Sequence, residues 1–132
     1  MTGEVRILHS VHAADIGRAI NPMQCRGQLD GAIAMGFGWA LYEKMVYDAN
    51  GAALNCALRD YRIPAFADVP RSEIYFADTY DSIGPLGAKA QGECGINPVA
   101  PAIANAVANA TGVRFADLPL TPDRIFDKLG AR

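Results

Sequence analysis

A long helix with a well-marked start constrains the fold of this chain more than any other feature. Ile20-Asn21-Pro22 marks that start, because Asn21 can cap a helix and Pro22 suits the first helical position. The residues that follow predict a helix that runs to about Glu43 or Lys44. Each glycine inside a helix costs up to about 1 kcal/mol relative to alanine. This helix contains Gly27, Gly31, Gly36 and Gly38. So many glycines predict that another group packs very close to the helix backbone.

Short strands are predicted before and after this helix. Residues 4–11 alternate between apolar and polar side chains, which predicts a strand, and residues 12–18 leave it as a loop. Asn50-Gly51 predicts a hairpin turn, with a return strand over residues 54–58. Residues 71–78 contain another strand.

Two further helices are predicted in the last third of the chain. An alanine-rich apolar stripe predicts a helix that starts near Asn97-Pro98, or at Pro101, and stops at Gly112. Thr121-Pro122-Asp123 predicts the start of a short terminal helix. With three or four strands and two longer helices, the chain is expected to be α+β. We expect a small mixed or antiparallel sheet packed against the two longer helices, in one domain over residues 1–132.

A glycine-rich loop over residues 84–98 carries a single acid, Glu93, and leads into the second helix. Glycine lets a backbone approach a ligand closely, so this loop could present a carboxylate and several N–H groups. Taken alone, the pattern favours an ordinary turn before a helix. Gln28 also has two interpretations, and the residues alone favour an exposed amide over one aimed at a buried ligand.

Composition excludes several classes of function. The 132 residues carry a net charge of −2 with scattered basic residues, which argues against nucleic-acid binding. Three separated cysteines without a Cys-x-x-Cys motif argue against a disulfide framework, and against a zinc or iron–sulfur site made by this chain alone. Reduced thiols favour the cytoplasm. His9 is expected to be a packed or edge histidine, and neither a signal sequence nor a membrane-spanning run is predicted.

A series of short motifs runs through the chain in a specific order and spacing. They are Ile20-Asn21-Pro22, Gly27-Gln28-Leu29-Asp30-Gly31, Gly36-Phe37-Gly38, Asp60-Tyr61-Arg62-Ile63-Pro64, Asp68-Val69-Pro70, Gly84-Pro85, Gly87-Ala88-Lys89-Ala90-Gln91-Gly92-Glu93, Leu118-Pro119 and Thr121-Pro122. This series resembles the C-terminal part of the molybdenum-cofactor subunit of the xanthine dehydrogenase/aldehyde oxidase family, over nearly the whole chain. The family often has Pro, Ala or Ser after the glutamate, where this chain has Cys94.

The resemblance implies roles for particular residues. Glu93 would be the general base in the hydroxylation of a carbon next to nitrogen or oxygen, with water as the oxygen source. The pKa of a carboxyl group in a water-poor pocket rises toward the operating pH of a base. Gln28 would hydrogen-bond near the molybdenum centre, and the backbone of Lys89, Ala90, Gln91 and Gly92 would border the cofactor. No residue of this chain is expected to ligate the metal.

The resemblance also implies partners. The family subunit is several times longer, so most of the molybdopterin pocket and of the substrate site would lie in parts absent here. FAD and 2Fe-2S clusters would be held by partner chains or domains, and the substrate would be an N-heterocycle such as a purine, or an aldehyde. The isolated chain would be inactive. The alternative is a non-catalytic interaction or scaffold domain that kept the fold.

Overall fold

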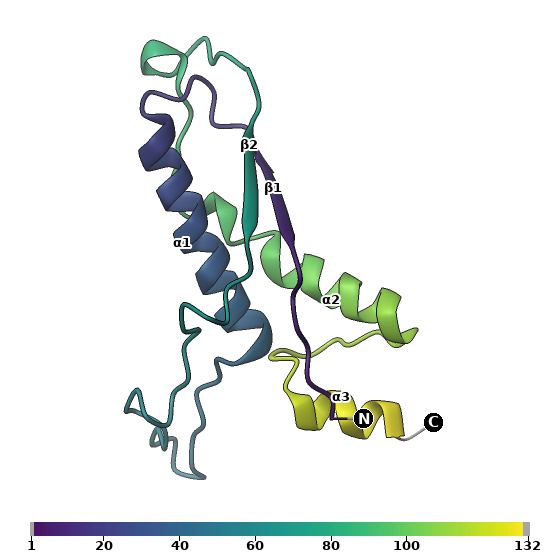
Figure 1. Ribbon diagram of the computed structural model, residues 1–132. Helices are drawn as coiled ribbons and strands as arrows, with labels where there is room; N and C mark the ends of the chain where they lie inside the picture. Colours follow the sequence, from purple (N-terminus) through teal and green to yellow (C-terminus); the bar gives the residue numbers. More distant parts are fainter. Residues whose placement is uncertain (1, 131–132) are drawn as a thin grey trace.

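The computed structural model describes residues 2–130 and shows an α+β arrangement in which one long helix lies beside a two-stranded sheet (Figure 1). The predicted α+β class is therefore confirmed. The elements in chain order are β1 (Ser10–Ala14), α1 (Pro22–Leu41), β2 (Ser72–Phe76), the single-turn 3₁₀ helices η1 (Pro85–Gly87) and η2 (Glu93–Gly95), α2 (Val99–Thr111) and α3 (Pro122–Gly130).

The two strands pair in parallel, with Ser10 opposite Ser72 and Ala14 opposite Phe76, so the predicted mixed or antiparallel sheet is wrong. The strand predicted over residues 4–11 is thus displaced toward the C-terminus, and residues 12–14, predicted as loop, belong to β1. The alternation in residues 4–9 has another cause. Val5 and Ile7 pack partly against the core, whereas Leu8 is 81% exposed. One-sided packing produces a period of two without any partner strand.

Helix α1 begins where the sequence predicts. The Asn21 side chain accepts a hydrogen bond from the Gln24 backbone N–H at 3.1 Å, and Pro22 occupies the first helical position. The helix ends at Leu41, slightly before the predicted end, where the backbone N–H of Tyr42 still bonds to the Gly38 carbonyl at 2.9 Å. Differences of this size are usual at helix ends, which fray.

The predicted hairpin forms only at its tip. Gly51 has φ +83°, and a single antiparallel bridge joins Tyr47 to Ala53. The return strand predicted over residues 54–58 is absent, so residues 2–130 contain two strands rather than three or four. The hairpin has no neighbouring strand to extend its ladder, and Leu54 and Leu58 are 62% and 76% exposed. An isolated two-stranded hairpin is marginal in water.

The two C-terminal helices match their predicted signals. Helix α2 starts at Val99 and stops at Gly112, whose φ of +71° places it in the left-handed conformation that glycine adopts readily. Helix α3 starts at Pro122. Within the described part of the chain, none of the helices is both long and apolar enough to cross a membrane.

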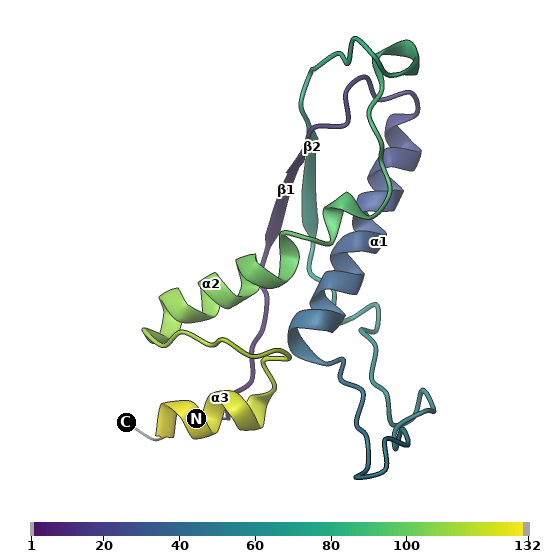
Figure 2. The ribbon, with the colours of Figure 1, turned by 180° about the vertical axis from the view of Figure 1, so that it is seen from behind.

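The core lies where α1, α2 and α3 meet. Its buried side chains come from the second half of α1, from one face of α2, and from Leu120 and Ile125. They are Ile33, Phe37, Ala40, Leu41, Val99, Ala100, Ile103, Val107, Leu120 and Ile125. The first half of α1 lies outside this core, and the loop after η1 runs along that half toward η2 in both views (Figures 1 and 2).

Candidate functional site

The glycine-rich loop is attached to α1 by one side chain. Gln91 Nε2 donates a hydrogen bond to the Cys25 carbonyl oxygen at 3.3 Å, and Cys94 Sγ donates to Gln91 Oε1 at 3.4 Å. Gln91 is half-buried by these contacts. The loop that carries Glu93 therefore lies on the N-terminal half of α1.

Close backbone packing makes a second attachment at η2. A Cβ at Gly95 would stand 2.5 Å from Leu29 Cδ2 and 3.0 Å from Ala32 Cβ, so only glycine allows this approach. Gly95 and Leu29 are both buried. Together, Gln91 and Gly95 fix the loop on both sides of Glu93.

Glu93 is the first residue of η2, and its side chain is exposed. No group in residues 2–130 donates a hydrogen bond to its carboxylate. The backbone N–H groups of Ala90, Gln91 and Gly92 likewise bond to no acceptor within the described residues. Three successive free N–H groups beside one free carboxylate can bind and orient a polar ligand, because such groups need partners once they are covered.

Gln28 is exposed and follows Cys25 by three positions, so it lies on the same side of α1 as the attachment of the loop. On either side of it, Gly27 and Gly31 have no atom within 4 Å of where a Cβ would stand. The prediction that groups pack close to the helix glycines is confirmed for Gly36, which contacts Val99, and for Gly38, which lies against Glu43 and Pro64. It is not confirmed for Gly27 and Gly31 within this chain. The N-terminal half of α1 thus presents an amide next to bare backbone.

Lys89 bonds to the segment that follows β1. Its ammonium donates to Asp15 Oδ2, and its backbone N–H donates to the Ile16 carbonyl at 2.8 Å. Hydrogen bonds to Asp15 from Lys89 first, and then from Thr79 and the Gly17 N–H, hold the pKa of the Asp15 carboxyl well below its usual range.

The structure therefore places four of the six predicted site residues, Gln28, Gln91, Gly92 and Glu93, on the same half of α1, with exposed Ala90 just before the first attachment of the loop. Asp15 was missed. The available signal was its position two residues before a loop glycine, where an aspartate often accepts the backbone N–H. Residues 2–130 contain no group of three or more His, Cys, Asp or Glu side chains that could hold a metal ion.

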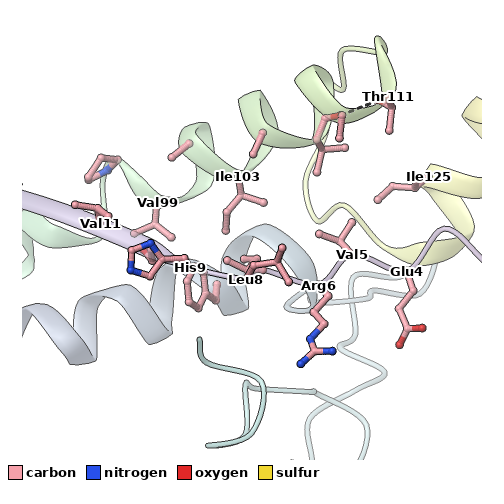
Figure 3. A pocket seen from close by; sticks show the side chains of 18 of the residues that line it. Glu4, Val5, Arg6, Leu8, His9, Val11, Val99, Ile103, Thr111 and Ile125 are labelled. Carbon is pink, nitrogen blue, oxygen red and sulfur yellow. Dashed lines mark hydrogen bonds between the residues drawn. The ribbon is translucent and has the colours of Figure 1, made fainter. Parts of the chain in front are cut away.

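A separate apolar groove of about 1030 Å³ lies between the extended segment 2–13 and α2. Figure 3 shows Val99 and Ile103 pointing from α2 toward that segment. Core residue Phe37 also lines the groove, whereas none of the six predicted site residues does. The groove is thus an open side of the core, distinct from the site on α1.

Comparison with known proteins places this geometry in a family. A sequence model described as molybdopterin cofactor-binding domain matches residues 1–70. The aldehyde oxidoreductase molybdenum-binding subunit PaoC from Escherichia coli K12 is 44% identical over 130 residues, covering 97% of this chain and 18% of that protein. A putative xanthine dehydrogenase molybdenum-binding subunit, XdhA from the same organism, is 41% identical, covering 95% of this chain and 17% of that protein.

A solved structure agrees with these sequence matches. Quinoline 2-oxidoreductase from Pseudomonas putida 86 superposes with a TM-score of 0.93 at 34% identity, over 99% of this chain and 17% of that one. The chain spans less than a fifth of the length of each of these relatives. The resemblance noted from the sequence motifs is confirmed. The chain belongs to the family of molybdopterin cofactor-binding domains that is represented in the molybdenum-binding subunits of aldehyde oxidoreductases and xanthine dehydrogenases.

Proposed function

We propose that residues 1–132 form one domain, the C-terminal segment of a molybdenum-binding oxidoreductase subunit, and that Glu93 is its general base. The reaction would be hydroxylation of a C–H next to a heteroatom, in an N-heterocycle such as a purine or in an aldehyde. The observation that carries this proposal is the Gln91–Cys25 hydrogen bond, because it places the Glu93 loop on the face of α1 that presents Gln28.

The exposed groups of this face fit a molybdopterin-type cofactor. Gly27 and Gly31 leave the helix backbone bare, since a Cβ added at either position would meet no atom within 4 Å. The Gln28 amide can both donate and accept hydrogen bonds. The free backbone N–H groups of Ala90, Gln91 and Gly92 suit the anionic and carbonyl oxygens of such a group. Lys89 marks the start of this stretch, with its ammonium already engaged by Asp15.

When bound, the cofactor would supply the two-electron redox chemistry, with water as the source of oxygen. The residues of this chain would orient the cofactor and accept a proton. A carboxylate oxygen of Glu93 would accept the proton that the attacking oxygen loses. Covering of Glu93 by the rest of the subunit would exclude water from the carboxylate and hold it within reach of that proton. The Gln28 amide would fix the orientation of the cofactor.

The proposal includes partners because the chain covers 18% of PaoC and 17% of XdhA, both named as subunits. The rest of the molybdenum subunit would supply most of the cofactor and substrate contacts. Iron–sulfur and flavin chains or domains would carry electrons away through 2Fe-2S clusters and FAD. Three free cysteines, Cys25, Cys56 and Cys94, are consistent with a cytoplasmic enzyme. The isolated chain would be inactive.

The test is Glu93→Gln in the complete complex, co-expressed with its partner chains and assayed on a panel of aldehydes and N-heterocycles. We expect turnover to fall by about 10²–10⁴-fold, the usual contribution of a general base, while molybdenum and pterin content stay unchanged. Glu4→Gln, which changes an exposed glutamate outside the site, is the matched control.

Gln28→Ala is the second variant. It should lower either turnover or the retention of molybdenum and pterin, because the amide would hold the cofactor. Near-normal turnover in Glu93→Gln would remove Glu93 from the chemistry. If turnover and cofactor retention in Gln28→Ala stay unchanged as well, the domain acts as a scaffold rather than as a catalytic segment.

A further inference from the structure

We infer that Asp15, at the end of β1, is a positioning residue that holds the loop carrying Glu93 in place through Lys89. This inference rests on the proposed function of Glu93. Asp15 is not among the predicted site residues, and its side chain contacts the loop rather than a ligand.

The Asp15 carboxylate joins three segments of the chain. Its Oδ1 accepts the Gly17 N–H at 3.1 Å and the hydroxyl of Thr79, and its Oδ2 accepts from the ammonium of Lys89. Gly17 follows β1, Thr79 follows β2, and Lys89 begins the stretch before Glu93. Both carboxylate oxygens are therefore used, and each ties Asp15 to a residue far along the sequence.

Backbone contacts fix the same crossing point. The Lys89 N–H donates to the Ile16 carbonyl at 2.8 Å, and the Arg18 N–H donates to the Gly87 carbonyl at 2.8 Å. Gly17, with φ +63°, lies so close to this strand-like pair that a Cβ there would stand 2.9 Å from the Lys89 nitrogen. The backbone bonds set the register, and the ion pair with Asp15 prevents the Lys89 side of the loop from lifting.

Three contacts therefore hold the stretch around Glu93. The first anchor is the Asp15–Lys89 contact, four residues before Glu93, the second is the Gln91–Cys25 hydrogen bond, and the third is Gly95 packed on Leu29. Between them, Ala90 and Gly92 are exposed and make no hydrogen bond within the described residues. Releasing the first anchor would let this stretch move, and a general base that is displaced by about 1 Å loses much of its effect.

The charged neighbours keep this anchor intact at neutral pH. Lys89, Thr79 and the Gly17 N–H hold the pKa of Asp15 below its ordinary value. Asp81 also lies near Asp15 and Lys89, and its own pKa is lowered first by the N–H groups of Gly84 and Ile83. Asp15 thus stays ionised, and the anchor is a permanent part of the fold rather than a switch.

The experiment uses the complete complex with Asp15→Asn, which keeps the shape and oxygen acceptor of the side chain but removes its charge. We expect kcat to fall about 10- to 100-fold, with KM changed less than about threefold and molybdenum content unchanged. Hydrogen exchange of the amides of residues 90–95 should become faster, while α2 exchanges as before. Lys89→Met should have the same effects, whereas Lys89→Arg should keep kcat and exchange close to their original values. The double variant Asp15→Asn/Lys89→Met should be no worse than either single variant.

Asp68→Asn is the matched control. Asp68 also accepts a backbone N–H, from Ala65 at 2.8 Å, and pairs with Arg62 at 3.3 Å, in a loop remote from Glu93. It should change neither kcat nor exchange at residues 90–95. The inference is overturned if Asp15→Asn leaves that exchange unchanged, or if exchange rises equally across the whole chain.

The exchange measurement separates this inference from the proposed function. If Glu93→Gln retains turnover, the general-base assignment fails, yet faster exchange at residues 90–95 in Asp15→Asn still shows that Asp15 holds the loop. If Glu93→Gln abolishes turnover but Asp15→Asn changes neither kcat nor local exchange, only the role of Asp15 is wrong.

Discussion

Gly36 in α1 lies directly against Val99, the first residue of α2. A Cβ at Gly36 would stand 2.6 Å from Val99 Cγ1, which is closer than real Cβ contacts. Both residues are buried, and Val99 belongs to the core where the helices meet. The crossing of α1 and α2 therefore depends on the absence of a side chain at position 36.

Gly36→Ala should destabilise the chain by about 1–3 kcal/mol, the usual effect of overpacking a filled core. Gly31→Ala is the control in the same helix, because a Cβ there meets no atom within 4 Å. It should stabilise the chain by up to about 1 kcal/mol through helix propensity. Urea unfolding followed by circular dichroism measures both, and equal midpoints for the two variants would contradict the close contact.

Gly27→Leu should separate stability from cofactor binding. Nothing within 4 Å obstructs a side chain at this position in the chain, so the unfolding midpoint should not fall. In the complete complex, the added side chain would cover the backbone proposed to border the cofactor. Molybdenum and pterin content should then drop severalfold. Full cofactor content in this variant would place the cofactor away from this part of α1.

Phe37→Ala should remove a large part of the stability of the domain. Phe37 is 2% exposed and belongs to the core cluster, and truncation of a buried phenylalanine costs about 3–5 kcal/mol. Phe66→Ala is the matched control, because Phe66 is 100% exposed. It should change the free energy of unfolding by no more than about 0.5 kcal/mol. Comparable losses in both variants would mean that Phe37 is not a core residue.

Stability should decrease as the pH falls below about 6.5, in part because of His12. Burial lowers the pKa of this imidazole, while nearby Asp30 opposes the shift. The unfolded chain then binds a proton at a pH where the folded chain does not, so acid favours unfolding. The melting temperature of His12→Gln should depend less on pH between about 7 and 5. His9→Gln is the control, and an unchanged slope in His12→Gln would show that other groups cause the dependence.

Local signals in the sequence account for the parts of the fold that were predicted correctly. Asn21-Pro22 starts α1, Gly112 stops α2 and Thr121-Pro122 starts α3, because capping depends on residues within one helical turn. The predicted bounds of β1 were wrong because they are set by its pairing with residues 72–76, far along the chain. A period of two shows that a segment is extended, but it does not show which residues find a partner.

The candidate site divides in the same way. Glu93, Gln28, Lys89 and Gln91 were predicted as site residues from their motifs, whereas the contacts that hold the loop were not predicted. Gln91 bonds to Cys25, and Lys89 bonds to Asp15, across long sequence separations. No local pattern encodes such a pair, because each contact exists only after α1 and the strands have been placed.

The parallel pairing of β1 with β2 also has a consequence for the order in which the chain folds. Parallel strands cannot be joined by a tight turn, so residues 15–71 must be brought round before Ser10 can meet Ser72. Helix α1 can form early from local hydrogen bonds. Closing a loop of this length, however, costs conformational entropy before the hydrogen bonds between β1 and β2 can offset it. During synthesis, β1 therefore cannot pair until β2 has emerged from the ribosome. Shortening the mostly exposed 48–60 part of this connection should speed folding more than it changes stability.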